Sequence, residues 1–113
     1  MNKSQIEISY GTSVVNIYIR NLGVAVKKGT GNFVVFCPTL NILGYSNKSA
    51  SDAFKDFEEN LSLYFEVHIK NKTLRDALTS KKWKRIGNTT NNNFDSELHP
   101  ALQEKDYKIS IAA

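Results

Sequence analysis

The chain has 113 residues, of which 41% are hydrophobic and 23% charged, and its formal net charge is +4. This length predicts a single domain over residues 1–113 with one two-layer core, expected at about residues 14–69, and leaves little room for an elaborate catalytic cleft. The longest apolar runs fall far short of the roughly 20 residues that cross a bilayer. We therefore expect no transmembrane helix and no signal peptide. The single cysteine allows neither an internal disulfide nor a zinc site of paired thiolates, which fits a cytoplasmic protein.

The two signs of charge are separated along the chain. Residues 49–68 carry five acids against Lys55, whereas residues 70–85 carry seven bases against Asp76. The seven bases are Lys70, Lys72, Arg75, Lys81, Lys82, Lys84 and Arg85. This pattern predicts a dipolar surface rather than a uniformly basic one.

The first apolar alternations predict antiparallel strands. Residues 6–10 alternate before a glycine and fit either a short strand or a loop. Residues 14–20 alternate over a longer stretch that is rich in β-branched side chains, and they predict a strand. Residues 21–23 predict a bend or bulge, after which residues 24–26 resume the strand.

A glycine-rich connection at residues 28–32 predicts a hairpin. Residues 33–37, which follow it, are apolar on both faces and predict a central strand with a helix on one side. Pro38 is expected to end that strand because proline cannot donate to a ladder. Residues 39–43 are expected to cross over to a short strand at residues 44–46.

The strongest local signal is a long amphipathic helix that begins after Ser49 and extends to about residue 69. Ser49 and Asp52 have the spacing of a capping box, in which the serine oxygen accepts an amide hydrogen and the acid bonds back. The predicted inner face is apolar and comprises Ala53, Phe54, Phe57, Leu61, Tyr64, Phe65 and His68. The predicted outer face is acidic with one leucine and comprises Asp52, Asp56, Glu59, Leu63 and Glu66.

The last third of the chain is less regular. Thr73 and Asp76 repeat the capping-box spacing and predict a shorter second helix. Its predicted inward residues are Leu74, Ala77 and Leu78. Residues 87–93 predict a polar loop, and residues 94–102 are only weakly patterned. Residues 107–111 alternate and predict a closing strand that docks on the sheet.

No pattern indicates catalysis, a cofactor or a metal centre. His68 ends the apolar stripe, where a packed histidine with one hydrogen bond is expected, and His99 precedes a proline in a loop. Cys37 ends an apolar strand and is expected in the core rather than as a reactive thiolate. Two-metal hydrolysis needs paired carboxylates on the strands, yet Glu7 is the only acid before Asp52. We therefore expect a protein that is not an enzyme.

Residues 81–85 leave two interpretations open. Cations around an aromatic residue are typical of nucleic-acid binding, with phosphates on the cations and a base stacked on the indole. The cluster comprises Lys81, Lys82, Trp83, Lys84 and Arg85. Alternatively, this is a solvated basic segment that Trp83 anchors to the core.

The order of these elements resembles the HicB family of type II antitoxins. The similarity covers about half of the chain, from residue 15 to residue 66. Its matching positions are residues 33–36, Pro38, Leu40, residues 43–46, Ser49, Asp52, Ala53, Asn60 and Tyr64. The resemblance implies an α+β fold of the truncated ribonuclease H type, βββαβ. In that fold a long helix packs on one face of three to four antiparallel strands, and the catalytic carboxylates are missing.

The resemblance also implies a function and partners. HicB-like antitoxins bind and occlude a small basic ribonuclease toxin of the HicA type, and they usually form homo-oligomers. An acidic helix face complements a basic toxin. The candidate contacts, inferred from the helix face, are Tyr45, Asp52, Asp56, Glu59, Leu63 and Glu66.

Many family members also bind their own promoter through a C-terminal ribbon-helix-helix or helix-turn-helix domain. Residues 80–113 contain no such pattern, so DNA binding is not carried over to this chain. Besides nucleic-acid binding by the basic segment, an oligomerising domain without a toxin partner is the remaining alternative.

Overall fold

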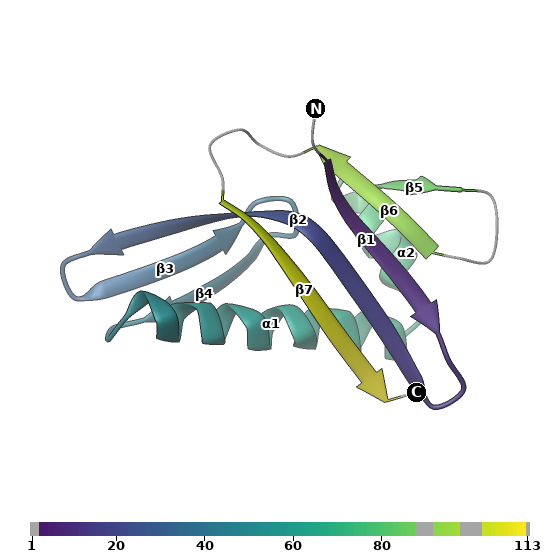
Figure 1. Ribbon diagram of the computed structural model, residues 1–113, viewed down its shortest axis with the longest axis horizontal. Coiled ribbons are helices and arrows are strands. Elements are labelled where there is room, and N and C mark those ends of the chain that lie inside the picture. Colours follow the sequence, from purple (N-terminus) through teal and green to yellow (C-terminus); the bar gives the residue numbers. More distant parts are fainter. Residues whose placement is uncertain (1–2, 88–91, 98–102, 113) are drawn as a thin grey trace.

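The computed structural model describes residues 3–87, 92–97 and 103–112. These residues form an antiparallel sheet and two helices (Figure 1). The strands are β1 (Lys3–Tyr10), β2 (Val14–Gly29), β3 (Asn32–Cys37), β4 (Ile42–Ser46), β5 (Lys84–Ile86), β6 (Asn92–Glu97) and β7 (Gln103–Ala112), and the helices are α1 (Ala50–Lys70) and α2 (Leu74–Ser80). The α+β class and the long helix after a run of antiparallel strands are therefore as predicted.

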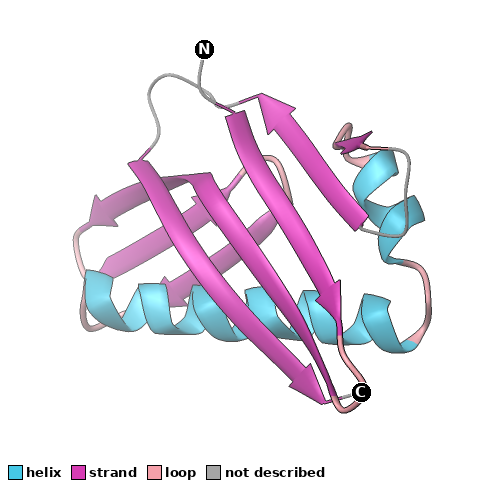
Figure 2. Ribbon diagram, turned by 45° about the vertical axis from the view of Figure 1, so that its right-hand side comes forward, coloured by secondary structure: helices cyan, strands magenta, loops and turns pink. Residues whose placement is uncertain are grey.

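The sheet is organised around β2, which has 16 residues. Residues 15–20 pair with β1 along one edge and residues 14–24 with β7 along the other, whereas residues 25–29 pair with β3. The strand order is β4-β3-β2-β1-β6-β5, with β7 added on β2 (Figure 2). The register on β7 shifts between Ile19 and Leu22, and Asn21 has a φ of 55°. This shift confirms the irregularity predicted at residues 21–23.

One continuous core joins the strands to the helices. Four residues of the predicted inner face of α1 are buried, and Phe54, Tyr64 and His68 are half-buried. The four are Ala53, Phe57, Leu61 and Phe65. Figure 1 shows α1 lying along the sheet beneath β3 and β4. Leu74 and Leu78 of α2 are buried too, as predicted, together with Phe94 of β6.

The number of strands differs from the prediction of three to four, because the described residues form seven. β1 pairs on both of its edges, with β2 and with β6, so the short alternation at residues 6–10 is a strand. In β6 only Phe94 is apolar, and β5 has three residues. Such segments give no periodic signal, and their partner strands determine their conformation. The loop predicted at residues 87–93 is wrong for Asn92 and Asn93, which pair with β1 as the start of β6. Residues 88–91 of that loop, and His99, lie outside the described residues.

The two predicted capping boxes have different outcomes. Ser49 Oγ accepts the amide hydrogen of Asp52 at 3.0 Å, as expected for the start of α1. The return bond is replaced, because the Ser49 amide donates to Ser46 Oγ at 3.4 Å. Thr73 makes no side-chain cap on α2, since its Oγ1 lies 2.7 Å from His68 Nδ1. The second capping box is therefore wrong, although α2 begins where it was expected.

Within the described residues, no helix combines the length and the apolar character needed to cross a membrane.

Candidate functional site

β4 and α1 pack closely together at Gly44, which is buried. A Cβ atom at residue 44 would lie 2.6 Å from Phe57 Cβ and closer still to backbone atoms of Ala53 and Phe57. Only glycine leaves room for the helix backbone at this point. The glycine at residue 44 therefore has a packing role in this chain.

Two polar side chains of α1 cover the edge of β4. This strand ends the sheet, so its outer backbone groups have no neighbouring strand. Asp56 Oδ2 accepts a hydrogen bond of 2.9 Å from the Tyr45 amide, and Asn60 Nδ2 donates one of 2.8 Å to the Leu43 carbonyl. Asp56 is thus engaged within the chain, unlike the free outer-face acid that the helical pattern predicts. It closes the strand edge against pairing with another chain.

The outer face of α1 exposes an apolar pair one turn apart. Leu63 is 56% exposed and Val67 43% exposed. A shallow depression of about 590 Å³ beside Leu63 is lined partly by Glu59 and Glu66. Glu66 forms an ion pair with Lys70 at 2.8 Å, whereas Glu59 has no ion pair with another described residue. We call these four residues, Glu59, Leu63, Glu66 and Val67, the α1 ridge.

The α1 ridge retains three of the predicted contacts and adds one. Val67 was missed, although it follows Leu63 at the spacing that places residues on the same helix face. A second depression, of about 390 Å³, runs from Leu63 and Val67 to Leu43 beside β4. Asp52 lies in the first turn of α1, where an acid interacts favourably with the helix dipole. The ridge is therefore an apolar strip with an acidic border.

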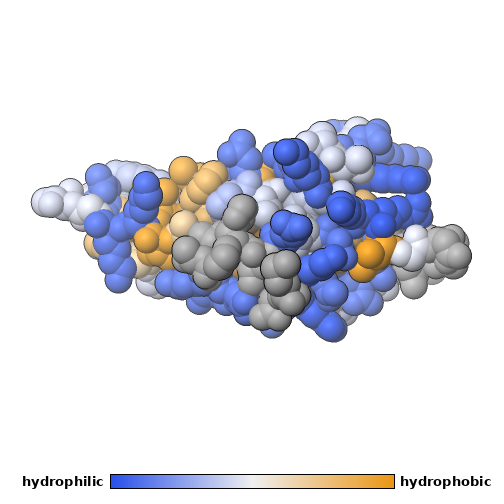
Figure 3. Space-filling model, turned by 90° about the horizontal axis from the view of Figure 1, so that it is seen from above, coloured by the Kyte–Doolittle hydropathy of each residue, from blue (hydrophilic) through white to orange (hydrophobic). Residues whose placement is uncertain are grey.

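Tyr45 is separated from the α1 ridge. Successive side chains of a strand point to opposite faces, and Gly44 faces α1. Tyr45, which is 51% exposed, therefore projects from the sheet face opposite the helix. Leu43, 49% exposed, also borders the depression beside Leu63 and Val67. Seen from above, hydrophobic side chains gather over the part of the molecule formed by β2, β3 and β4 (Figure 3).

His68 and Cys37, whose side chains could take part in chemistry, are both packed against the interior of the protein. His68 is half-buried, bonds Thr73 through Nδ1 and packs edge-on against Tyr64 at 4.6 Å between ring centroids, as expected of a packed histidine. Cys37 is fully buried, and this burial raises the pKa of its thiol, with the Thr39 hydroxyl at 3.4 Å opposing the shift. A thiol held neutral is a poor nucleophile. Among the described residues, no three His, Cys, Asp or Glu side chains gather as a metal site.

Trp83 anchors its segment to the core. Its side chain is 2% exposed, and Nε1 donates a 2.9 Å hydrogen bond to the carbonyl of Thr39 in the β3–β4 turn. A buried indole cannot stack on a base, so the structure separates Trp83 from the basic residues around it. Lys82, Lys84 and Arg85 are exposed.

We compared the chain with models of protein families, with curated proteins and with solved structures. None of them matches. The HicB-like interpretation therefore rests on the residues of this chain and on the surfaces described above.

Proposed function

We propose that this protein is a HicB-like antitoxin, which binds a small basic ribonuclease toxin of the HicA type and occludes its RNA-binding surface. The observation that carries the proposal is the α1 ridge, an exposed apolar pair with an acidic border. Interfaces combine an apolar centre with a polar rim. Acidic charge at that rim favours encounter with a basic partner. Occlusion needs no catalysis by the antitoxin and no cofactor.

The HicB-like residues have coherent physical roles in this fold, which supports the proposal. Pro38 follows β3 at the start of the turn to β4. Gly44 leaves room for the backbone of α1, and Ser49 caps the N-terminus of that helix. Asn60, another matching position, covers the β4 edge. These residues place α1 against the sheet and leave its outer face available to a partner.

The proposal includes a cellular setting. We place the protein in the cytoplasm, where a ribonuclease toxin would meet RNA and where its antitoxin would therefore act. Homo-oligomers, common among HicB-like antitoxins, are part of the proposal, and the exposed side chains of Leu43 and Tyr45 are available for such contacts. The competing assignment is an oligomerising domain with no toxin partner.

The test uses the full chain and each small basic protein that a neighbouring reading frame is found to encode. Calorimetry measures affinity at low salt, and a ribonuclease assay measures inhibition. Glu59→Lys combined with Leu63→Ser should weaken binding by at least about tenfold, because an interface centre loses an apolar contact and gains a like charge. Glu7→Lys on β1 is the matched control for charge reversal at an exposed acid.

Unchanged affinity in the double variant, with folding intact by circular dichroism, would remove the α1 ridge from the interface. Failure of every neighbouring basic protein to bind the wild type, together with a self-associating chain, would favour the oligomerising domain instead.

A further inference from the structure

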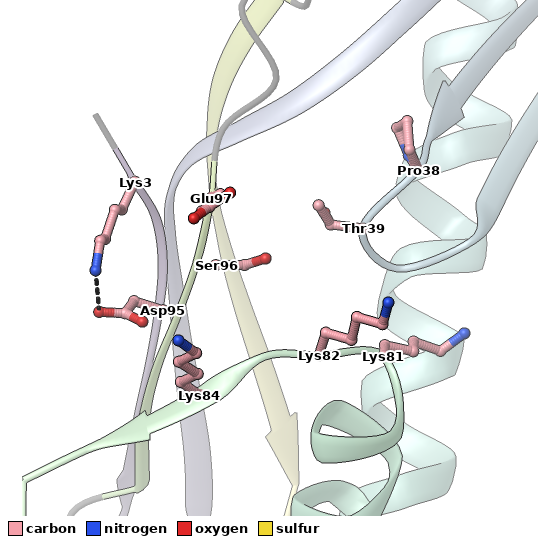
Figure 4. Close-up of a pocket in the computed structure, with 9 residues that line it drawn as sticks. All are labelled: Lys3, Pro38, Thr39, Lys81, Lys82, Lys84, Asp95, Ser96 and Glu97. Carbon is pink, nitrogen blue, oxygen red and sulfur yellow. Dashed lines mark ion pairs between the residues drawn. The ribbon is translucent and has the colours of Figure 1, made fainter. Parts of the chain in front are cut away.

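A cleft lies away from the α1 ridge, between the β3–β4 turn, the α2–β5 connection and strand β6 (Figure 4). Its volume is about 470 Å³. Four lysines and two carboxylates line it. The lysines are Lys3, Lys81, Lys82 and Lys84. We call it the lysine cleft. It brings together residues from four separate segments of the chain, and the antitoxin proposal does not use it.

The fold holds the basic segment rigidly at this cleft. Trp83 is buried and bonded to the Thr39 carbonyl, which ties residues 82–84 to the β3–β4 turn. The Lys82 amide bonds the Thr79 carbonyl at 3.0 Å, and Lys82 has a φ of 68°. Lys82 and Lys84 flank the buried indole, and both are exposed. Their side chains therefore start from a fixed backbone beside the cleft.

The charges of the cleft leave cations in excess. On the β6 wall, Asp95 is paired with Lys3 at 3.6 Å, which compensates that carboxylate. Glu97 is the other acid of the lining. Lys81 lies 5.8 Å from the ring centroid of Tyr64, and Figure 4 shows it directed away from β6. Lys82 and Lys84 form no ion pair with another described residue. The cleft thus holds four ammonium groups against two carboxylates, an excess of two positive charges, although Asp95 lies opposite Lys84 in the register of β5 and β6.

We propose that the lysine cleft binds phosphate groups of a nucleic-acid backbone, with Lys82 and Lys84 as the direct contacts. Lysine binds phosphate as a point charge and needs no bidentate geometry. Lys72 and Arg75, close to the start of α2, are also exposed. The segment before the cleft therefore carries further positive charge, which suits a ligand with repeating phosphates.

The binding is independent of base sequence, for a structural reason. The only tryptophan of the chain is buried beneath the cleft, so it offers no stacking surface. Contacts to phosphates position a nucleic acid but carry no sequence information. Duplex and single strand should therefore both bind, and binding should depend steeply on salt.

The experiment measures binding of a short fluorescent DNA duplex of mixed sequence, and of a single-stranded RNA, to the full chain by anisotropy over a series of salt concentrations. The plot of log affinity against log salt has a negative slope. Lys82→Gln combined with Lys84→Gln should make this slope shallower by about 1.8 for the duplex and about 1.4 for the single strand. The matched control is Lys27→Gln with Lys28→Gln, which removes the same charge from the exposed end of β2. It should leave the slope close to that of the wild type.

Trp83 fluorescence gives a second readout, because this single tryptophan lies beside the cleft. Saturating duplex should change its emission in the wild type and in the control variant. Absence of nucleic-acid binding at low salt would overturn the proposal. Equal losses in the two double variants would overturn it as well, because binding would then follow net charge alone. Inorganic phosphate that changes the emission as readily as the duplex would overturn the assignment to a polymer. None of these results bears on toxin binding by the α1 ridge.

Discussion

Gly44 gives the most direct test of how α1 is held on the sheet. In Gly44→Ala the new Cβ would meet backbone atoms of Ala53 and Phe57, which cannot rotate away as a side chain could. The helix has to move. Its movement also stretches the hydrogen bonds of Asp56 and Asn60 to β4, at 2.9 and 2.8 Å.

The magnitude follows from these contributions. Overpacking costs about 1–3 kcal/mol, and weakening two hydrogen bonds adds about 1 kcal/mol. Replacing glycine reduces the entropy of the unfolded chain and offsets roughly 0.4–1 kcal/mol of that loss. We expect a net loss of about 2–3 kcal/mol, which corresponds to a melting temperature lower by roughly 10 °C in a domain of this size.

Urea unfolding followed by circular dichroism measures this loss. Gly31→Asn is the control, since residue 31 has a φ of 71° with open space around it, and asparagine tolerates that conformation. The control should change stability by less than about 0.5 kcal/mol. If Gly44→Ala loses less than about 1 kcal/mol, the close approach of β4 and α1 does not limit the packing and the reasoning fails.

Two further predictions concern polar side chains of the helix region. Asp56→Ala should destabilise by about 1 kcal/mol through loss of the bond to the Tyr45 amide, whereas Glu59→Ala should be nearly neutral; equal urea midpoints would contradict the edge-covering role of Asp56. Burial raises the pKa of Tyr64 and of Tyr107 to about 12, with repulsion from Glu58 also raising that of Tyr107. A tyrosine in the unfolded chain ionises at about pH 10. The stability that comes from keeping these two hydroxyls neutral is therefore complete below that pH, and it is lost as the pH rises through 12. The urea midpoint should decrease between about pH 10 and about pH 12 in the wild type. It should decrease less steeply in the double variant Tyr64→Phe with Tyr107→Phe.

The sequence by itself determined the elements whose signals are local and repeated. The stripe from Ala53 to Phe65, with the serine cap before it, fixes α1 because residues three and four apart share a face. The alternation in β2 and the glycine turn after it fix the hairpin with β3. The burial of Cys37 followed from its place at the end of an apolar strand.

Only the tertiary structure decided the rest, because the deciding contacts join residues far apart in sequence. β6 carries one core side chain and becomes a strand by pairing with β1. Asp56 looks like any surface acid on a helical wheel until the free edge of β4 is placed beside it. Trp83 became an anchor through the Thr39 carbonyl, 44 residues away, and that same bond gathers Lys82 and Lys84 at a cleft. Periodicity reports which face of an element is buried, whereas partners across the sheet decide what each remaining polar group does.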